Sequence, residues 1–579
     1  MSRSTQETIT QPDTTQEPVA AKFTSRGSVA QQAAARLFEG TMNKVTFVIL
    51  SFEGPDPYSR AGGLASRVTE LSTALASMGL ETHLFFVGDP GLPGHEVAND
   101  GRLHLHRWCQ WISRYHPSGV YEEEEGKLFD WDRSLPAWME SDLLRPKVEA
   151  GCPVVVLGEE WHTAGTITRL RQIVDRRGWH DRVFLLWNAN NTFSFHRIDW
   201  GALKRAAAIT TVSRYMKHVM WRYGVDARVV PNGISERWLV PVDQRASMAL
   251  SSLFRNRVVL VKVARWDPDK RWLMAVDAVA EMKRLGLRPL FLARGGIEAH
   301  GREVLDRAGQ RGLVVAKVRW TGNSPDAMAQ ALQSVLGSDM VIMENYLDEG
   351  QRRLLFHVAD GVLANSGIEP FGLVGLEAMA AGGVAFVGCT GEDYVTPGYD
   401  AIALQTSDPW EIVKHVVRLR TFPHEQGRLR RAARVSAARH TWTSVIRRLL
   451  LPALEQMGLH IGIPDNIYER GGMAVRGEER YRVWSDKLGE VVSDPQAALG
   501  KARNMGYHEL HGWIRELWHA RNQIKQGQLH PAVSRRPTAR EVACAEEAWS
   551  VLQQMRRVLD EKRPDVQGRR RASEPAVVS

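Results

Sequence analysis

The sequence predicts an α/β fold made of two Rossmann-like units, followed by a helical extension. A chain of 579 residues is too long for one hydrophobic core, so two or three domains are expected. Continuous apolar runs at 44–50, 258–263 and 361–364 are typical of strands that a parallel sheet buries on both faces. A loop and a helical pattern follow each run, and this alternation favours parallel sheets covered by helices.

The order of these patterns predicts the domain boundaries. Residues 1–40 are rich in Thr, Gln, Ser and Pro and are expected to be disordered. We expect the first Rossmann-like unit at 41–240 and the second at 241–430. Helices that cross back onto the first unit are expected at 431–460, and a helical extension with a disordered basic tail at 461–579.

Charge and cysteine usage exclude some classes of protein. The net charge of +9 includes an Arg-rich stretch at 428–448, but such runs are usually solvated helix faces, and no nucleic-acid motif accompanies it. We therefore expect no nucleic-acid partner. The four cysteines lack C-x-x-C spacing, which argues against a disulfide framework or a zinc site and indicates a reducing, cytoplasmic setting; they are Cys109, Cys152, Cys389 and Cys544.

The start of the chain is polar and has no apolar core of a signal peptide. No later run is long and apolar enough to span a bilayer, so we expect no transmembrane segment and leave a peripheral membrane contact open.

A glycine-containing loop in the first unit predicts an anion site. After the strand at 44–50 the loop passes Arg60, and Gly62 and Gly63 then open an amphipathic helix that runs to about Met78. Backbone N–H groups at a helix start attract phosphate. Two glycines without the third of a dinucleotide fingerprint are also typical of an ordinary turn.

The second unit contains the most informative stretch. The strand at 361–364 leads through a turn that holds Glu369 and Gly372 into a helix that begins at Leu373. Glycine lets the backbone approach a ligand at the positive end of that helix, where phosphate fits. Glu377 lies about one turn into the helix, so two carboxylates can face one cleft.

Three further side chains follow predicted strands, where ligands of α/β sheets gather. His162 comes soon after the strand at 154–157, and Arg265 and Lys270 come after the strand at 258–263. A lone histidine is more often a hydrogen-bonded structural residue, and the two cations are also explained as surface charge.

The stretch E-P-F-G-L-x-x-L-E-A-M-A-x-G from Glu369 to Gly382 resembles the E-x7-E signature of retaining GT-B glycosyltransferases, which include glycogen and starch synthases. Arg60 to Leu64 is similar to their Lys-x-Gly-Gly-Leu loop, and the turn at His162 is similar to their Asp-Trp-His-Ala turn. The resemblance covers about 44–455. It implies a GT-B fold, in which two Rossmann-like domains face a cleft, the first on the acceptor side and the second binding the nucleotide sugar.

The resemblance also implies roles for single residues. Glu369 and His162 would contact the donor sugar, Glu377 would bind the ribose hydroxyls, and the cations would clamp the diphosphate. The implied catalytic residues are Glu369, His162, Arg265 and Lys270. The implied donor-binding residues are Arg60, Gly62, Gly63, Gly372, Leu373 and Glu377.

The sequence departs from the family pattern at three places. Arg60 replaces a lysine, and its planar fork can change the geometry of a phosphate contact. Glu160 replaces the Asp before Trp161, which leaves its role open. The segment 187–191 stands where many relatives carry a Thr-x-His-Asn segment, and this leaves the acceptor contacts open.

The resulting expectation is a retaining, metal-independent hexosyltransferase without a cofactor. It would move a hexose, most simply glucose, from a nucleotide diphosphate sugar to a glycan or small hydroxyl acceptor. The D-x-D pairs at 130–132 and 267–269 are interpreted as surface acids, so no metal ligand is assigned.

Two other functions stay open. The first is a transferase of the same fold that builds a cell-surface glycan or a small glycoside. The second is a catalytically silent sugar-nucleotide-binding module whose C-terminal helices, predicted at 509–523 and 541–559, recruit a protein partner.

Overall fold

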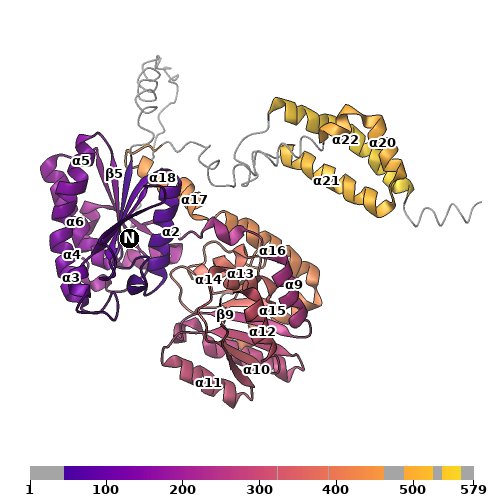
Figure 1. The fold of residues 1–579 in the computed structure, drawn as a ribbon, viewed down its shortest axis with the longest axis horizontal. Helices are drawn as coiled ribbons and strands as arrows, with labels where there is room; N and C mark the ends of the chain where they lie inside the picture. Colours follow the sequence, from indigo (N-terminus) through magenta and orange to yellow (C-terminus); the bar gives the residue numbers. More distant parts are fainter. Residues whose placement is uncertain (1–44, 323, 389, 462–487, 526–537, 563–579) are drawn as a thin grey trace, which may run out of the picture. The chain divides into compact units, whose positions relative to one another are not determined.

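The computed structural model describes residues 45–322, 324–388, 390–461, 488–525 and 538–562. In these ranges the chain forms two β-sheets covered by helices and a further group of helices near the carboxyl end (Figure 1). The predicted disorder at 1–40 and in the basic tail lies outside the described residues. The predicted α/β class is confirmed.

The first sheet has eight strands in the order β3-β4-β2-β1-β5-β6-β7-β8. All neighbours are parallel except β3 and β4, which are antiparallel. The central strands are apolar and buried on both faces, as a parallel sheet between helices requires. The strands are β1 (Thr46–Leu50), β2 (Glu81–Val87), β3 (His95–Ala98), β4 (Leu103–Trp108), β5 (Val154–Glu159), β6 (Val183–Ala189), β7 (Ala208–Thr211) and β8 (Arg228–Val229).

The second sheet has seven strands in the order β11-β12-β10-β9-β13-β14-β15, and every neighbouring pair is parallel. In this order β9 lies beside β13, so the loops that follow these two strands meet at one edge of the sheet. The strands are β9 (Val258–Val263), β10 (Pro289–Arg294), β11 (Val315–Val318), β12 (Met340–Met343), β13 (Gly361–Ala364), β14 (Ala385–Val387) and β15 (Ile402–Ala403).

Helices connect the strands of both sheets. Those between the strands of the first sheet are α2 (Gly63–Ser77), α3 (Gln110–Ser113), α4 (Glu124–Trp138), α5 (Arg145–Glu149), α6 (Ala164–Arg177), α7 (Trp200–Ala206) and α8 (Arg214–Met220), and α9 (Gln244–Leu253) leads to the second sheet. Those of the second sheet are α10 (Trp272–Arg284), α11 (His300–Gln310), α12 (Pro325–Gln333), α13 (Glu349–Val358), α14 (Leu373–Ala380), α15 (Pro409–Thr421) and α16 (Pro423–Ala438).

The stretch 108–144 has no clear apolar period in the sequence, yet it is mostly helical. It contains α3, α4 and a π-helical segment, Met139–Leu144. Its apolar residues Trp131, Leu135 and Leu144 are fully buried. The charged Lys127 lies on the buried face of α4, and it interrupts the apolar pattern that would indicate a helix. Its ammonium donates to the carbonyls of Gly119 and Val120.

The Arg-rich stretch 428–448 is not simply a solvated helix face. On α16, Arg430 donates to the carbonyls of Gly382 and Ala359, and Arg434 donates to that of Ala380. These guanidinium groups satisfy carbonyls at the ends of α13 and α14, so part of the positive charge stabilises the fold.

Two short helices, α17 (Trp442–Val445) and α18 (Leu451–Glu455), belong to the core around α2 and the first sheet. Trp442 is 1% exposed, and its indole Nε1 donates to Glu70 Oε2 at 3.0 Å. Its backbone N–H donates to the carbonyl of Ile234. Gly233 is needed here because a Cβ would lie 2.7 Å from Trp442 Cα.

The carboxyl-terminal helices are α20 (Pro495–Asn504), α21 (Tyr507–Lys525) and α22 (Ala539–Glu561), which include the two that the sequence predicts. They share a core of their own that contains Leu517 and Leu552. Trp513 packs against this core, whereas Trp518 and Trp549 are half exposed. Within the described ranges, no helix combines the length and apolar character that a membrane span requires.

Replacing Trp442 by alanine should lower the free energy of unfolding of the first sheet's core by about 3–5 kcal/mol, because a fully buried indole is lost and a cavity remains. Denaturant unfolding followed by circular dichroism measures the change. Trp111→Ala is the control, because Trp111 is 64% exposed and lies just after β4 of the same sheet. Equal effects of the two substitutions would contradict the packing described for α17.

Candidate active site

Lys270 and Glu369 form an ion pair where β9 and β13 end. Lys270 Nζ lies 2.5 Å from Glu369 Oε2. Thr390 fixes the backbone at Glu369. Its hydroxyl accepts from the Glu369 N–H at 2.8 Å and donates to the Glu369 carbonyl at 3.0 Å. A strong hydrogen bond between opposite charges therefore stands at the carboxyl edge of the second sheet.

Arg265 follows β9 in the same loop but lies apart from this ion pair. Its side chain is exposed, and its backbone carbonyl accepts from Trp272 Nε1 at 2.8 Å. The structure thus brings together Lys270 and Glu369, and leaves the guanidinium of Arg265 in solvent. Its contact with a diphosphate stays a prediction.

Gly372 caps the amino end of α14, and Leu373 is the first helical residue, as predicted. The Gly372 carbonyl accepts from Tyr394 Oη at 2.5 Å. A Cβ at Gly372 would lie 3.0 Å from Glu392 Oε1 and 3.2 Å from Tyr394 Oη. A side chain here would thus be in tight contact with Glu392 and Tyr394, which would have to shift by a few tenths of an ångström.

Glu392 is a buried acid behind this helix start that the sequence analysis missed. One oxygen accepts from the Thr390 N–H at 3.0 Å, and the other has no hydrogen-bond partner among the described residues. Burial, together with the nearby Glu369 carboxylate, raises the pKa of Glu392 to about 7. Near neutral pH the group is thus partly protonated, which limits the negative charge close to Gly372.

Glu377 is largely buried on α14 and pairs with Arg352 of α13, whose Nη1 lies 2.9 Å from Glu377 Oε2. Burial raises the pKa of Glu377, and the guanidinium opposes that shift. The Arg352 guanidinium also lies over the Trp238 ring, 5.0 Å from its centroid. The two glutamates of the E-x7-E stretch therefore have separate partners, Lys270 for Glu369 and Arg352 for Glu377.

The start of α2 is occupied by a carboxylate that the sequence analysis missed. Glu53 Oε2 accepts from the N–H groups of Gly62 at 2.9 Å and Ala65 at 3.0 Å. Its Oε1 accepts from Tyr121 Oη at 2.7 Å. The chain itself thus supplies an anion at this helix start, and the predicted phosphate contact there stays a prediction. Arg60 and Gly63 remain exposed beside it.

His162 is 3% exposed and lies in an aromatic setting. Its ring stacks on Phe52 with centroids 4.1 Å apart, and its Nε2 lies 2.7 Å from Glu124 Oε1. Its Nδ1 has no hydrogen-bond partner among the described residues. Burial lowers the pKa of His162, so the imidazole favours the neutral form. Glu124 is the first residue of α4.

Glu160, whose role was left open, holds the loop after β6. Its Oε1 accepts from the N–H groups of Asn190 at 2.7 Å and Asn191 at 3.2 Å. The residue adopts a φ of 67°, a left-handed conformation that non-glycine residues rarely adopt. Burial raises the pKa of Glu160 to about 8.

The neighbouring Glu159 is fully buried and is the centre of a polar network. Its carboxylate accepts from Arg67 Nε at 3.0 Å and from the side-chain amides of Asn188 at 2.9 Å and Asn190 at 2.8 Å. Arg67 Nη1 continues to Asn232 Oδ1 at 2.7 Å. The segment that departs from the family pattern is thus tied to the strand end before His162.

Two doubly wound sheets with charged side chains at their carboxyl edges define the class of protein: this is the architecture of GT-B glycosyltransferases. Residues 61–238 match the family model Glycosyltransferase Family 4. The chain is 24% identical over 425 residues to the D-inositol 3-phosphate glycosyltransferase of Frankia alni, which covers 67% of this chain and 93% of that protein.

Solved structures agree with this class in fold. Sucrose-phosphate synthase from Thermosynechococcus elongatus is similar with a TM-score of 0.51 at 17% identity, over 72% of this chain and 99% of that one. The catalytic domain of starch synthase IV from Arabidopsis thaliana is similar with a TM-score of 0.50 at 13% identity, over 70% and 100%. The predicted resemblance to GT-B glycosyltransferases is confirmed, and the fold is theirs.

Glu160→Gln should change how stability depends on pH. Because the folded pKa of about 8 lies above the ordinary value of 4.5, the neutral acid contributes stability that is complete below 4.5 and is lost as pH rises through 8. Glutamine keeps the acceptor oxygen without the charge. The melting temperature of the wild type should therefore fall, relative to the variant, between about pH 5 and 9.

Melting curves across this range measure the effect, with Glu149→Gln as a control at an exposed position of the same half of the chain. A constant difference between wild type and the Glu160 variant at every pH would contradict the buried, neutral carboxyl.

Proposed function

We propose that the protein transfers a hexose, with glucose as the expected sugar, from a nucleotide diphosphate sugar to a hydroxyl acceptor with retention at the anomeric carbon. The observation that carries the proposal is the Lys270–Glu369 ion pair at the ends of β9 and β13, beside the glycine that starts α14. A cation, a helix start and a carboxylate then lie at the sheet edge where α/β folds bind their ligands.

The chemistry needs positive charge where the leaving diphosphate forms. The Lys270 ammonium has three N–H donors, so it can keep Glu369 as a partner while it meets a phosphate oxygen. The N–H groups at the start of α14 add a second donor set, and each charge-assisted hydrogen bond contributes about 1.5–3 kcal/mol. These groups supply the charge without a metal ion, and we propose that transfer is metal-independent and uses no cofactor.

The remaining predicted residues have consistent places in this scheme. Glu377 is held by Arg352 and is proposed to bind the ribose hydroxyls. The neutral His162 is proposed to lie against the donor sugar through its free Nδ1. Arg265, exposed after β9, is proposed to reach the diphosphate. Arg60 and Gly63 are proposed to approach the donor from the first sheet, as is Gly62, whose N–H is already bonded to Glu53.

A second candidate differs in the acceptor. The curated relative is named for D-inositol 3-phosphate, and a structural neighbour is named sucrose-phosphate synthase. Both names support a small hydroxyl acceptor over a polymer. A nucleoside diphosphate as the leaving group is supported by the starch synthase IV structure, which is described as bound to ADP and acarbose.

Thermal shifts against a panel of nucleotide diphosphate sugars should identify the donor, because a ligand that binds only the folded state raises its melting temperature. Turnover of the stabilising donor is then measured with glycan, inositol phosphate and monosaccharide phosphate acceptors, with and without a chelator. We expect a shift, product with the α-linked donor's configuration retained, and nearly unchanged rates in the chelator. A strict need for added magnesium or manganese would refute metal independence, and a shift without turnover would favour a silent binding module.

Replacing each of the two carboxylates should change a different kinetic constant. Glu369→Gln removes the charge nearest the bond being broken and should lower kcat with a smaller change in KM, whereas Glu377→Gln should mainly raise the donor KM. The loss expected in each case is about tenfold to a hundredfold. Glutamine is preferred to alanine at 377 because alanine would leave the half-buried Arg352 without its carboxylate.

Steady-state kinetics on both variants, with circular dichroism to confirm folding, measures these effects. Glu349→Gln, a substitution near Arg352 outside the E-x7-E stretch, is the control for general disturbance of α13. Wild-type kcat in Glu369→Gln, or the reverse pattern in the two variants, would show that the division of roles is wrong.

A further inference from the structure

Four histidines gather on one face of the first sheet, on β2, β3 and β4. His83 is the parallel partner of His104, and His95 is the antiparallel partner of His106. Residues two apart on a strand share a face, which places His104 and His106 together. The rings of His83 and His104 stack with centroids 4.4 Å apart and an angle of 8° between the planes.

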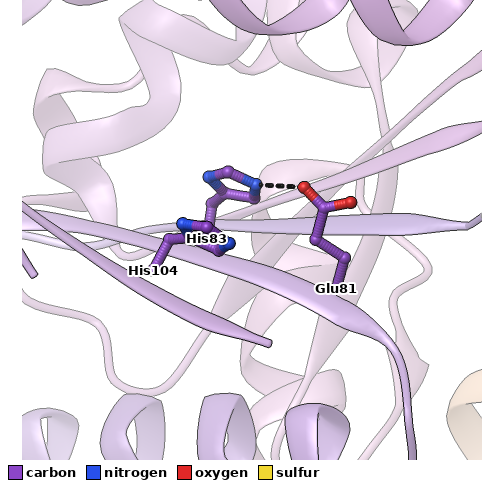
Figure 2. A group of neighbouring side chains, drawn as sticks. All are labelled: Glu81, His83 and His104. Carbon is purple, nitrogen blue, oxygen red and sulfur yellow. Dashed lines mark hydrogen bonds and ion pairs between the residues drawn. The ribbon is translucent and has the colours of Figure 1, made fainter. Parts of the chain in front are cut away.

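Glu81 lies close to two of these imidazoles. His83 Nε2 lies 2.9 Å from Glu81 Oε1, and one ligand atom from each of Glu81, His83 and His104 lies within 4.8 Å of the others. Figure 2 shows the three side chains converging from β2 and β4, with the His83 nitrogen directed at the Glu81 carboxylate. Two imidazoles and one carboxylate form a donor set that suits a divalent transition metal.

The other ring nitrogen of each imidazole is already held. His83 Nδ1 lies 3.0 Å from His106 Nε2, and His104 Nδ1 lies 3.2 Å from His95 Nε2. Such outer hydrogen bonds orient the ring and select the tautomer in metal sites. They leave Nε2 of both rings as the atoms for a cation, because Nδ1 is engaged in each.

We propose that Glu81, His83 and His104 bind a divalent transition-metal cation, with Zn²⁺ as the ion that fits best. Zn²⁺ takes imidazole nitrogen and carboxylate oxygen, and three protein ligands leave a fourth position for water. In the tautomer whose Nδ1–H donates to His106 Nε2, the Nε2 lone pair of His83 is available to the ion, which then replaces the present contact between Nε2 and Glu81. The stacked rings must turn, because the lone pairs lie in the ring planes.

Lys147 on α5 is the competitor. Its Nζ lies 2.6 Å from both oxygens of Glu81, in the position that makes the carboxylate least available. A bound cation must displace this ammonium. The affinity of the cluster for a divalent cation should therefore rise when Lys147 is replaced by an uncharged residue. A surface histidine that bound the cation by chance would not respond to this substitution.

The cluster is distinct from the proposed transfer site. Glu81 begins β2, and His104 lies at the start of β4, so the cluster is at the amino ends of these strands. Glu53 and His162 follow the carboxyl ends of β1 and β5 in the same sheet. A cation here would tie β4 to β2 without entering the sugar transfer, and the proposal is independent of the proposed function.

The test is Zn²⁺ binding to the full-length chain, measured by competition with a chromophoric chelator. The wild type should bind one Zn²⁺ that His104→Gln and Glu81→Gln each weaken about tenfold or more. Lys147→Met should tighten binding several-fold. His180→Gln is the matched control, an exposed imidazole with one carboxylate neighbour, Asp175, at 3.6 Å, and it should bind as the wild type does.

A second measurement, the visible absorption of bound Co²⁺, tests the proposal on the wild type itself in case a ligand variant folds poorly. Co²⁺ added to the wild type and to Lys147→Met should give the visible absorption of a four-coordinate ion with nitrogen and oxygen ligands, and His104→Gln should lose it. No Zn²⁺ bound by the wild type, equal affinity in the ligand variants and the control, or weaker binding in Lys147→Met would each overturn the proposal.

Discussion

The adjacency of β9 and β13 is the constraint on which the candidate donor site depends. In a parallel sheet the carboxyl ends of neighbouring strands lie at one edge, so two loops separated by about a hundred residues meet there. Lys270 and Glu369 are brought to 2.5 Å by this topology alone. The glycine at the start of α14 completes the site because it follows the same strand as Glu369.

A buried lysine supports this edge from within the sheet. Lys262 on β9 is fully buried, and its Nζ donates to the Leu363 carbonyl at 3.0 Å and to Asn365 Oδ1 at 2.6 Å. Burial and the nearby Lys270 lower the pKa of Lys262 well below its ordinary value. The side chain thus links β9 to the end of β13, and its hydrogen bonds offset the cost of placing an amine inside the core.

Several buried charged groups of the two sheets form ion pairs. Arg67 with Glu159, Arg352 with Glu377 and Arg107 with Asp56 are ion pairs with little exposure. Such pairs add little net stability, but removal of one partner is costly, so they define a particular arrangement of loops. The two edges of the first sheet carry different polar groups. Carboxylates accept from loop N–H groups at the carboxyl ends of its strands, and imidazoles stack at the amino ends.

The sequence by itself determined the α/β class, most strand and helix positions, and the stretch from Glu369 to Glu377, because these depend on local patterns of apolar residues, glycine and motif spacing. Only the tertiary structure showed which residues contact the predicted site residues. Glu53 at the start of α2, Arg352 beside Glu377, Glu392 behind Gly372 and Glu124 beside His162 are ordinary residues in sequence, and no local period points to them. The histidine cluster was likewise hidden, although H-x-H on β4 places both rings on one face, because its carboxylate and other imidazoles come from strands whose order in the sheet the sequence does not state.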